Sequence, residues 1–248
     1  MSKIPNIILT QDEYKQLLRQ EQMRGGEAII SPSGNPNTRY KLFMNQSHYE
    51  SPMNENKTKK IMELHRRKIK HLVKPLSTIS FNGKMVGYEM TYDPFDRSLE
   101  SLSFLPRKQL IRVLRETKEI LEYLNSEGIT YGDVTADNIL VNIKTGVVKF
   151  CDIDNMQVGE NPIDIKGFSL SRYHSKTGVI DSKADAFMHN LLTIKKLSAP
   201  DKFESTIIQE LEREIYPTRF KQGAKPIFES MANPESFTGE YVVQYVKR

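Results

Sequence analysis

The sequence predicts an α+β protein of two lobes, a strand-rich lobe followed by a helical one. Short apolar runs separated by turn-forming residues dominate roughly the first hundred residues, whereas long runs with helical spacing follow later. A chain of 248 residues can bury the cores of two small domains. We therefore expect a first lobe over residues 1–92 and a helical second lobe over residues 93–248.

The first lobe is expected to contain two helices and two pairs of strands. A charged helix is predicted over 11–23, ending near Gly25 and Gly26, and a basic helix over 57–73. Strands are predicted over 27–30, 38–44, 77–81 and 85–91. The last two strands flank Asn82-Gly83, a dipeptide typical of a tight hairpin.

The second lobe is expected to be built around a helix over 107–126. Its apolar residues recur at helical spacing, Pro106 precedes it and Gly128 follows it. A hairpin should follow, with strands over 139–143 and 147–151, and then helices over 185–197 and 203–215. The apolar run 241–246 fits either a final helix or an edge strand.

The positive charge of the chain is concentrated in one segment, residues 57–74. This segment holds eight Lys or Arg against Glu63, and the remaining 28 basic and 30 acidic residues leave a net charge of −2. It can be a solvated helix face or a docking surface for an acidic partner or a nucleic acid. No aromatic residue interrupts it, so base stacking is not expected there.

Composition excludes several classes of protein. A single cysteine, Cys151, cannot form an internal disulfide or a cysteine-based zinc site. No run approaches the roughly 18 apolar residues that a membrane span needs, and the first residues do not form a secretory signal. We expect a cytoplasmic protein without membrane association.

The stretch from Gly128 to Asp154 carries the clearest chemistry. It places Asp133 and Asn138 five residues apart on a loop and follows them with a hairpin that ends at Asp152. Carboxylate and amide oxygens suit Mg²⁺, which proteins usually bind through one or two carboxylates together with substrate phosphates. The stretch therefore predicts a site for a phosphorylated ligand.

Two motifs in this stretch resemble the protein kinase-like superfamily, in particular its compact bacterial and phage Ser/Thr members. Residues 131–138 (YGDVTADN) match the catalytic loop, and residues 149–154 (KFCDID) match the strand and metal-binding turn after it. The resemblance implies a two-lobed kinase-like fold that uses ATP and Mg²⁺. It makes Asp133 the catalytic base, and Asn138 and Asp152 the metal ligands.

The motifs depart from the family pattern at several positions. Gly132 replaces the arginine of His-Arg-Asp, so activation by loop phosphorylation is not expected. Thr135 stands where Ser/Thr kinases place a phosphate-contacting lysine, and Asp154 replaces the glycine of Asp-Phe-Gly. No Ala-Pro-Glu closes the activation segment.

The resemblance also assigns nucleotide-binding residues in the first lobe. Residues near a shortened glycine-rich loop would approach the phosphates, Lys41 would pair with them, and the backbone after the fourth predicted strand would bind adenine. These residues are Gly25, Gly26, Glu27, Ala28, Lys41, Thr91 and Tyr92. Gly25-Gly26 is equally typical of a helix cap followed by a turn, and Arg39 competes with Lys41 on the same strand face.

Two further acidic residues have family counterparts. Glu63 is the obvious helix partner for Lys41, but a helical wheel places it opposite the apolar side of its helix. The partner could instead be Glu50 or Glu55, with Glu63 a solvated charge. Asp185 resembles the buried aspartate that holds the catalytic-loop backbone, although it could also serve as a first-turn acid of its helix.

These residues predict an ATP- and Mg²⁺-dependent phosphotransferase acting on Ser or Thr hydroxyls of a protein. Two alternatives remain. One is a pseudokinase, a nucleotide-binding scaffold that holds a partner through segment 57–74. The other is a small-molecule kinase of the aminoglycoside or choline type. Thr135 argues against it, because those enzymes usually carry histidine at this position.

Overall fold

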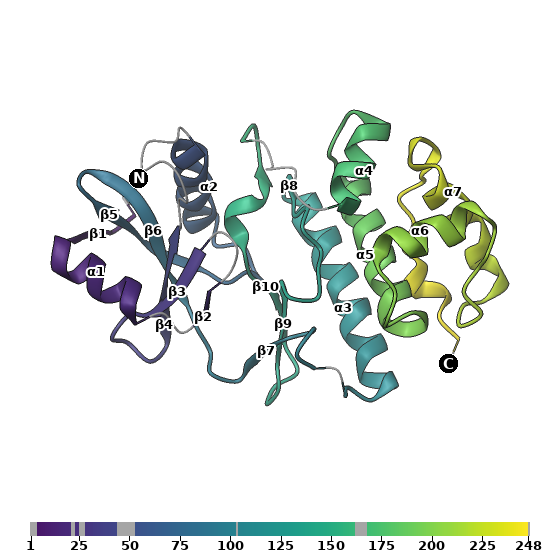
Figure 1. Cartoon of the computed structure of the whole chain (residues 1–248), viewed down its shortest axis with the longest axis horizontal. Helices are drawn as coiled ribbons and strands as arrows, with labels where there is room; N and C mark the ends of the chain where they lie inside the picture. Colours follow the sequence, from purple (N-terminus) through teal and green to yellow (C-terminus); the bar gives the residue numbers. More distant parts are fainter. Residues whose placement is uncertain are drawn as a thin grey trace. The chain divides into compact units, whose positions relative to one another are not determined.

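A computed structural model describes residues 4–20, 23–24, 28–43, 53–102, 104–161 and 168–247 (Figure 1). The chain divides into two compact units. Unit 1 comprises Met1–Asp96, Asn142–Thr145 and Phe150–Asp154, and unit 2 comprises Arg97–Val141, Gly146–Lys149 and Asn155–Arg248. The predicted boundary after residue 92 did not anticipate the two short segments that return to unit 1.

Unit 1 is built on a sheet of six described strands in the order β1-β5-β6-β4-β3-β2. Strand β1 runs parallel to β5, and the other neighbours are antiparallel. The strands are β1 (Asn6–Leu9), β2 (Met23–Arg24), β3 (Ala28–Pro32), β4 (Thr38–Phe43), β5 (Pro75–Phe81) and β6 (Lys84–Thr91). The β5–β6 hairpin turns at Asn82 and Gly83, whose φ angles of 49° and 74° suit an Asn-Gly turn, so that prediction is confirmed.

Helix α1 (Gln11–Arg19) packs its apolar side on this sheet. Its Tyr14 stacks on Phe81 with ring centres 4.6 Å apart, beside the fully buried Leu42 and Ile79. Thr10 and Glu13 form a capping box at its start. The predicted end at residue 23 is wrong, because the chain leaves the helix after Arg19 and Met23–Arg24 pair with β3 as strand β2.

Helix α2 (Met53–Arg67) begins and ends earlier than the predicted 57–73. It stops at Lys68, whose φ of 52° is left-handed and incompatible with a continuing helix. After it, the N–H of Val73 donates to the carbonyl of Phe150 and the N–H of Phe150 donates to the carbonyl of His71, both at 2.8 Å. These bonds attach residues 150–154 to unit 1.

Unit 2 is mainly helical. Helix α3 (Arg107–Ser126) has both predicted ends, with Pro106 before it and Gly128 after it at a φ of 71°. The other helices are α4 (Phe168–Thr177), α5 (Ser182–Ser198), α6 (Glu204–Glu212) and α7 (Lys225–Ala232). The run 241–246 is neither a regular α-helix nor a strand, because Val242–Tyr245 form a 3₁₀ helix with Val242 and Val243 buried.

Two small sheets complete the described secondary structure. One has the order β10-β9-β7, from Val148–Phe150, Ile139–Asn142 and Asp96–Ser98, and the other pairs β11 (Gln157–Val158) with β8 (Ile129–Thr130). The mixed α and β content agrees with the predicted α+β class. Among the described residues, no helix combines the length and apolarity needed to cross a bilayer.

Candidate active site

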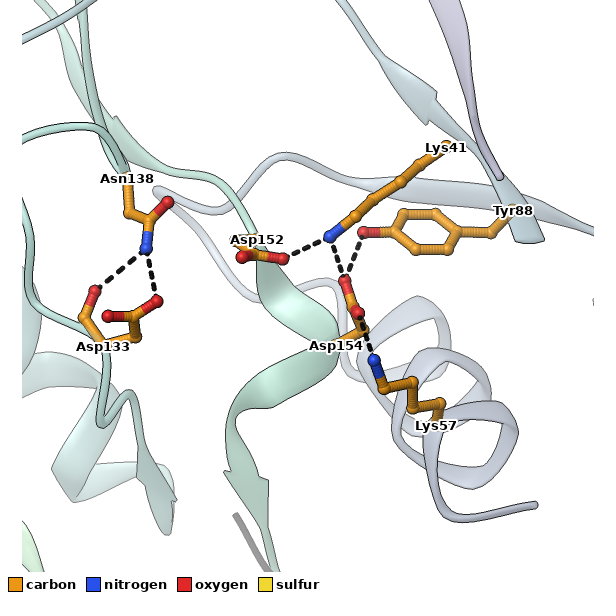
Figure 2. A network of polar contacts seen from close by, with 7 residues as sticks. All are labelled: Lys41, Lys57, Tyr88, Asp133, Asn138, Asp152 and Asp154. Atoms are coloured by element: carbon orange, nitrogen blue, oxygen red, sulfur yellow. Dashed lines mark hydrogen bonds and ion pairs between the residues drawn. The ribbon is translucent and has the colours of Figure 1, made fainter. Parts of the chain in front are cut away.

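Five polar side chains from four elements of unit 1 form one bonded cluster (Figure 2). They are Lys41 on β4, Lys57 on α2, Tyr88 on β6, and Asp152 and Asp154 after β10. Lys41 and Tyr88 are direct cross-strand partners in the β4–β6 register, which places both side chains on the same face of the sheet.

Lys41 donates to both aspartates. Its Nζ lies 2.5 Å from Asp154 Oδ1 and also bonds Asp152 Oδ1. The Tyr88 hydroxyl donates to the same Asp154 oxygen at 3.1 Å, and Lys57 Nζ lies 3.2 Å from Asp154 Oδ2. Asp154 therefore accepts three donors, each from a different element.

The two aspartates differ in exposure and in the direction in which their pKa values are displaced. The Asp154 side chain is 2% exposed and that of Asp152 is 29% exposed. Burial alone would raise the pKa of Asp154, but Lys41 and Lys57 outweigh it and hold that pKa below its ordinary 3.8. Burial, aided by the neighbouring Asp154 charge, raises the pKa of Asp152. Asp154 is thus a buried anion held by its partners, and Asp152 is the more exposed carboxyl group of the pair.

Lys41 remains a cation although it is buried. Desolvation alone would lower its pKa, but the charge of Asp154, with that of Asp152, outweighs this and raises the pKa well above the ordinary 10.5. Buried charges are tolerated only when they are paired and hydrogen-bonded, and here two lysines balance two aspartates.

The backbone at Asp152 explains how both aspartates reach Lys41. Asp152 has a φ of 56°, a left-handed conformation that aspartate tolerates better than most residues. The chain then enters a 3₁₀ turn over Ile153–Asn155, in which Ile153 is fully buried. Asp152 and Asp154 therefore point toward the lysine while the residue between them packs in the core.

The predicted catalytic loop lies in unit 2 and brings Asp133 and Asn138 together (Figure 2). Asn138 Nδ2 donates to Asp133 Oδ2 at 2.7 Å and to the Asp133 carbonyl at 3.2 Å. The N–H of Thr135 also donates to the Asp133 carbonyl, at 2.9 Å. Spacing in the sequence and contact in the structure thus agree for this pair.

Asp185 holds the backbone that leads into this loop. Its two carboxylate oxygens accept the N–H groups of Tyr131 at 2.9 Å and Gly132 at 2.6 Å, and the residue is fully buried. The helix cap of α5 is a different residue, Asp181, which accepts from the first-turn N–H groups. Gly132 has a φ of 77°, so this position favours glycine over the family's arginine.

The predicted adenine-binding backbone is partly engaged within unit 1. The N–H of Thr91 donates to the Lys74 carbonyl at 2.9 Å, and the N–H of Tyr92 donates to the Asn37 carbonyl at 2.8 Å. These two N–H donors are therefore occupied, and adenine binding by the backbone of Thr91 and Tyr92 stays a prediction that involves other groups of this segment.

The remaining predicted nucleotide contacts have different outcomes. Ala28 is buried on β3 opposite Phe43. Arg39 stacks over the Tyr92 ring at 3.8 Å, which separates its role from that of Lys41. The predicted contacts at Gly25, Gly26 and Glu27, and the alternative Lys41 partner Glu50, lie outside the described residues, as does the side chain of Glu55.

Glu63 does not pair with Lys41. Its carboxylate lies 3.3 Å from Arg66 and 3.7 Å from Arg67, on the side of α2 away from the buried Ile61 and Leu64. Glu63 is therefore a partly exposed charge and not the partner of Lys41, as its position on the helical wheel indicates.

Sequence reasoning missed Lys57, Tyr88 and Asp154. Segment 57–74 is not uniformly solvated, because Lys57 and Lys60 are 4% and 1% exposed. Its exposed basic residues are Lys59, Arg66, Arg67, Lys68, Lys70 and Lys74. The i, i+2 repeat of aspartate at 152 and 154 was the available signal for a second carboxylate.

The described residues contain no cluster of three His, Cys, Asp or Glu side chains that could cage a metal by themselves. A Mg²⁺ ion at Asp152 would therefore need oxygens from a substrate as well, as is usual for this ion. No protein-family model matches this chain, and no curated protein matches it in sequence.

Proposed function

We propose that the protein is an ATP- and Mg²⁺-dependent phosphotransferase of the protein kinase-like fold, acting on Ser or Thr hydroxyls of a protein. The main support for this proposal is the contact between Asp133 and Asn138. Both lie on a loop whose backbone is held by Asp185. The buried Lys41 with its accessible neighbour Asp152 adds the second set of groups that such a reaction needs.

Each residue has a definite task in this proposal. Lys41 would place an ammonium against the nucleotide phosphates. Asp152 would supply an oxygen ligand for the metal ion that bridges these phosphates, and Asn138 would hold one metal ion at the catalytic loop. Bound Mg²⁺ would neutralise phosphate charge, while ATP supplies the phosphoryl group. Asp133 orients the attacking hydroxyl and accepts its proton as the new P–O bond forms and the bond to ADP breaks.

One observation favours a second candidate, the pseudokinase. Asp152 is bonded to Lys41, and the N–H groups of Thr91 and Tyr92 are engaged within the protein. A bound nucleotide would have to replace the bond between Asp152 and Lys41, and it could not use the N–H groups of Thr91 and Tyr92. A module that binds ATP without transferring phosphate would fit these contacts.

Labelled phosphate transfer separates the candidates. Purified protein is incubated with γ-labelled ATP, Mg²⁺ and a generic basic protein, beside Asp133→Asn and Asp152→Asn variants. Asp137→Asn is the matched control, because it removes one carboxylate from an exposed position of the same loop. A kinase labels the substrate, loses this activity in both test variants and keeps it in the control. ATP binding without any label identifies the pseudokinase.

A further inference from the structure

We propose that Asp154, rather than Glu63 of α2, is the residue that positions Lys41 for the nucleotide phosphates, and that Lys57 of α2 holds Asp154 in place. This inference rests on the proposed function. Among the described side chains of α2, a cation, Lys57, bonds the Lys41 cluster, whereas the resembling family places an anion of this helix there.

The contacts of Asp154 carry this assignment. Both of its oxygens are used: Oδ1 accepts from Lys41 at 2.5 Å and from Tyr88 at 3.1 Å, and Oδ2 faces Lys57 at 3.2 Å (Figure 2). Charge-assisted bonds of this kind are the strongest and most directional ones in proteins. With 2% of its side chain exposed, Asp154 has little access to water, so its geometry is set by these three donors.

Glu63, the alternative partner for Lys41, forms ion pairs elsewhere. Glu63, the acid of α2 within segment 57–74, bonds Arg66 and Arg67 of its own helix. Lys57 instead faces inward from α2, is 4% exposed and lies 4.9 Å from the centre of the Phe43 ring. Of the α2 side chains that the structure describes, a lysine thus bonds the Lys41 cluster, through Asp154.

This arrangement divides the two aspartates by role. Asp152 is the more exposed of the pair and can exchange its bond with Lys41 for a metal ion. Lys41 would then keep its bond to Asp154, so its ammonium stays fixed while the metal ligand is released. Asp154 and Lys57 are thus positioning residues, and they need not touch the substrate.

The test compares the Michaelis constant for ATP, kcat and direct binding of ATP with Mg²⁺ across matched variants. We expect Asp154→Asn to weaken ATP binding and raise KM by about tenfold or more, because Lys41 loses a charged partner. Asp154→Glu, which keeps the charge, should recover part of the loss. Glu63→Gln and the exposed Lys59→Met are controls and should stay within about twofold of wild type.

A charge exchange, Lys57→Asp with Asp154→Lys, separates positioning from simple ion-pair stability. It preserves the pair between positions 57 and 154 but leaves Lys41 facing a cation. We expect ATP binding to stay as weak as in Asp154→Asn. Recovery of wild-type binding by the exchange would overturn the proposal, as would an effect of Glu63→Gln equal to that of Asp154→Asn.

Two further outcomes are informative. If Asp154→Asn does not fold, Lys57→Met tests the same contact, and an unchanged KM and binding constant would refute the inference. If wild type binds ATP without transferring phosphate, the proposed kinase function fails. Direct binding of ATP with Mg²⁺ to the Asp154 variants still tests the role of Asp154. If wild type does not bind ATP at all, both proposals fail.

Discussion

Two buried ionisable side chains of α5, Asp185 and His189, have pKa values displaced in opposite directions. Burial raises the pKa of Asp185 from 3.8 to about 7, against the opposing effect of the Gly132 and Tyr131 N–H groups. Burial lowers the pKa of His189 from 6.5 to about 4. His189 Nε2 lies 2.9 Å from the Leu114 carbonyl, which can only accept, so this nitrogen carries the proton of a neutral ring.

The two groups make opposing contributions to the pH dependence of stability. Between pH 4.5 and 6.0 folded Asp185 keeps a proton that the unfolded chain has lost, so acidification stabilises the fold by about 1.4 kcal/mol per pH unit. Over the same range unfolded His189 binds a proton that the folded ring does not, so acidification destabilises the fold at the same rate. The wild-type contributions therefore cancel, each amounting to about 2 kcal/mol over the interval.

Urea unfolding at pH 6.0 and 4.5 would expose the two contributions separately. His189→Gln removes the contribution that destabilises the fold in acid. Between pH 6.0 and 4.5 the free energy of unfolding of this variant should therefore rise by about 2 kcal/mol relative to wild type. Asp185→Asn should lose about 2 kcal/mol relative to wild type, and the double variant should return to the wild-type slope. Using differences from wild type removes the titration of all other groups. Equal slopes for wild type and His189→Gln would refute the assignment of a buried neutral histidine.

Four other outcomes follow from the described contacts. Gly87→Ala would place a Cβ onto the Lys41 carbonyl oxygen, so it should destabilise the protein by about 1–3 kcal/mol and weaken ATP binding, measured by thermal unfolding and ATP titration. Asp133→Asn should lower kcat by about 10²–10⁴ with little change in KM for ATP, measured by steady-state kinetics. Chelation of Mg²⁺ by EDTA should abolish phosphate transfer, and added Mg²⁺ should restore it; transfer that persists in EDTA would contradict the proposed cation role. Ile79→Ala should cost about 2–5 kcal/mol in urea unfolding, because Ile79 is fully buried in the unit 1 core.

Helix and hairpin ends were predictable wherever the signal is local. The bounds of α3 follow from Pro106 and Gly128, and the β5–β6 turn follows from Asn82-Gly83. The ends of α1 and α2 were not predictable in this way. Helix α1 stops early because β2 pairs with β3, and α2 stops at a left-handed Lys68 before the chain meets Phe150. The end of α1 depends on pairing between strands that follow it closely, and the segment after α2 bonds Phe150, which is distant in sequence.

In the candidate site, too, contacts between residues near in sequence were predictable and contacts between distant residues were not. By itself the sequence determined the pairing of Asp133 with Asn138, because five residues of one loop keep them within reach. It also placed Lys41 on a strand and Asp152 after a hairpin. Only the tertiary structure decided the partners of Lys41, since Asp154 lies 113 residues from it and Lys57 lies 97 residues from Asp154. No local periodicity encodes such contacts, because they form only when the sheet, α2 and the segment after β10 pack together and the buried charges must be paired.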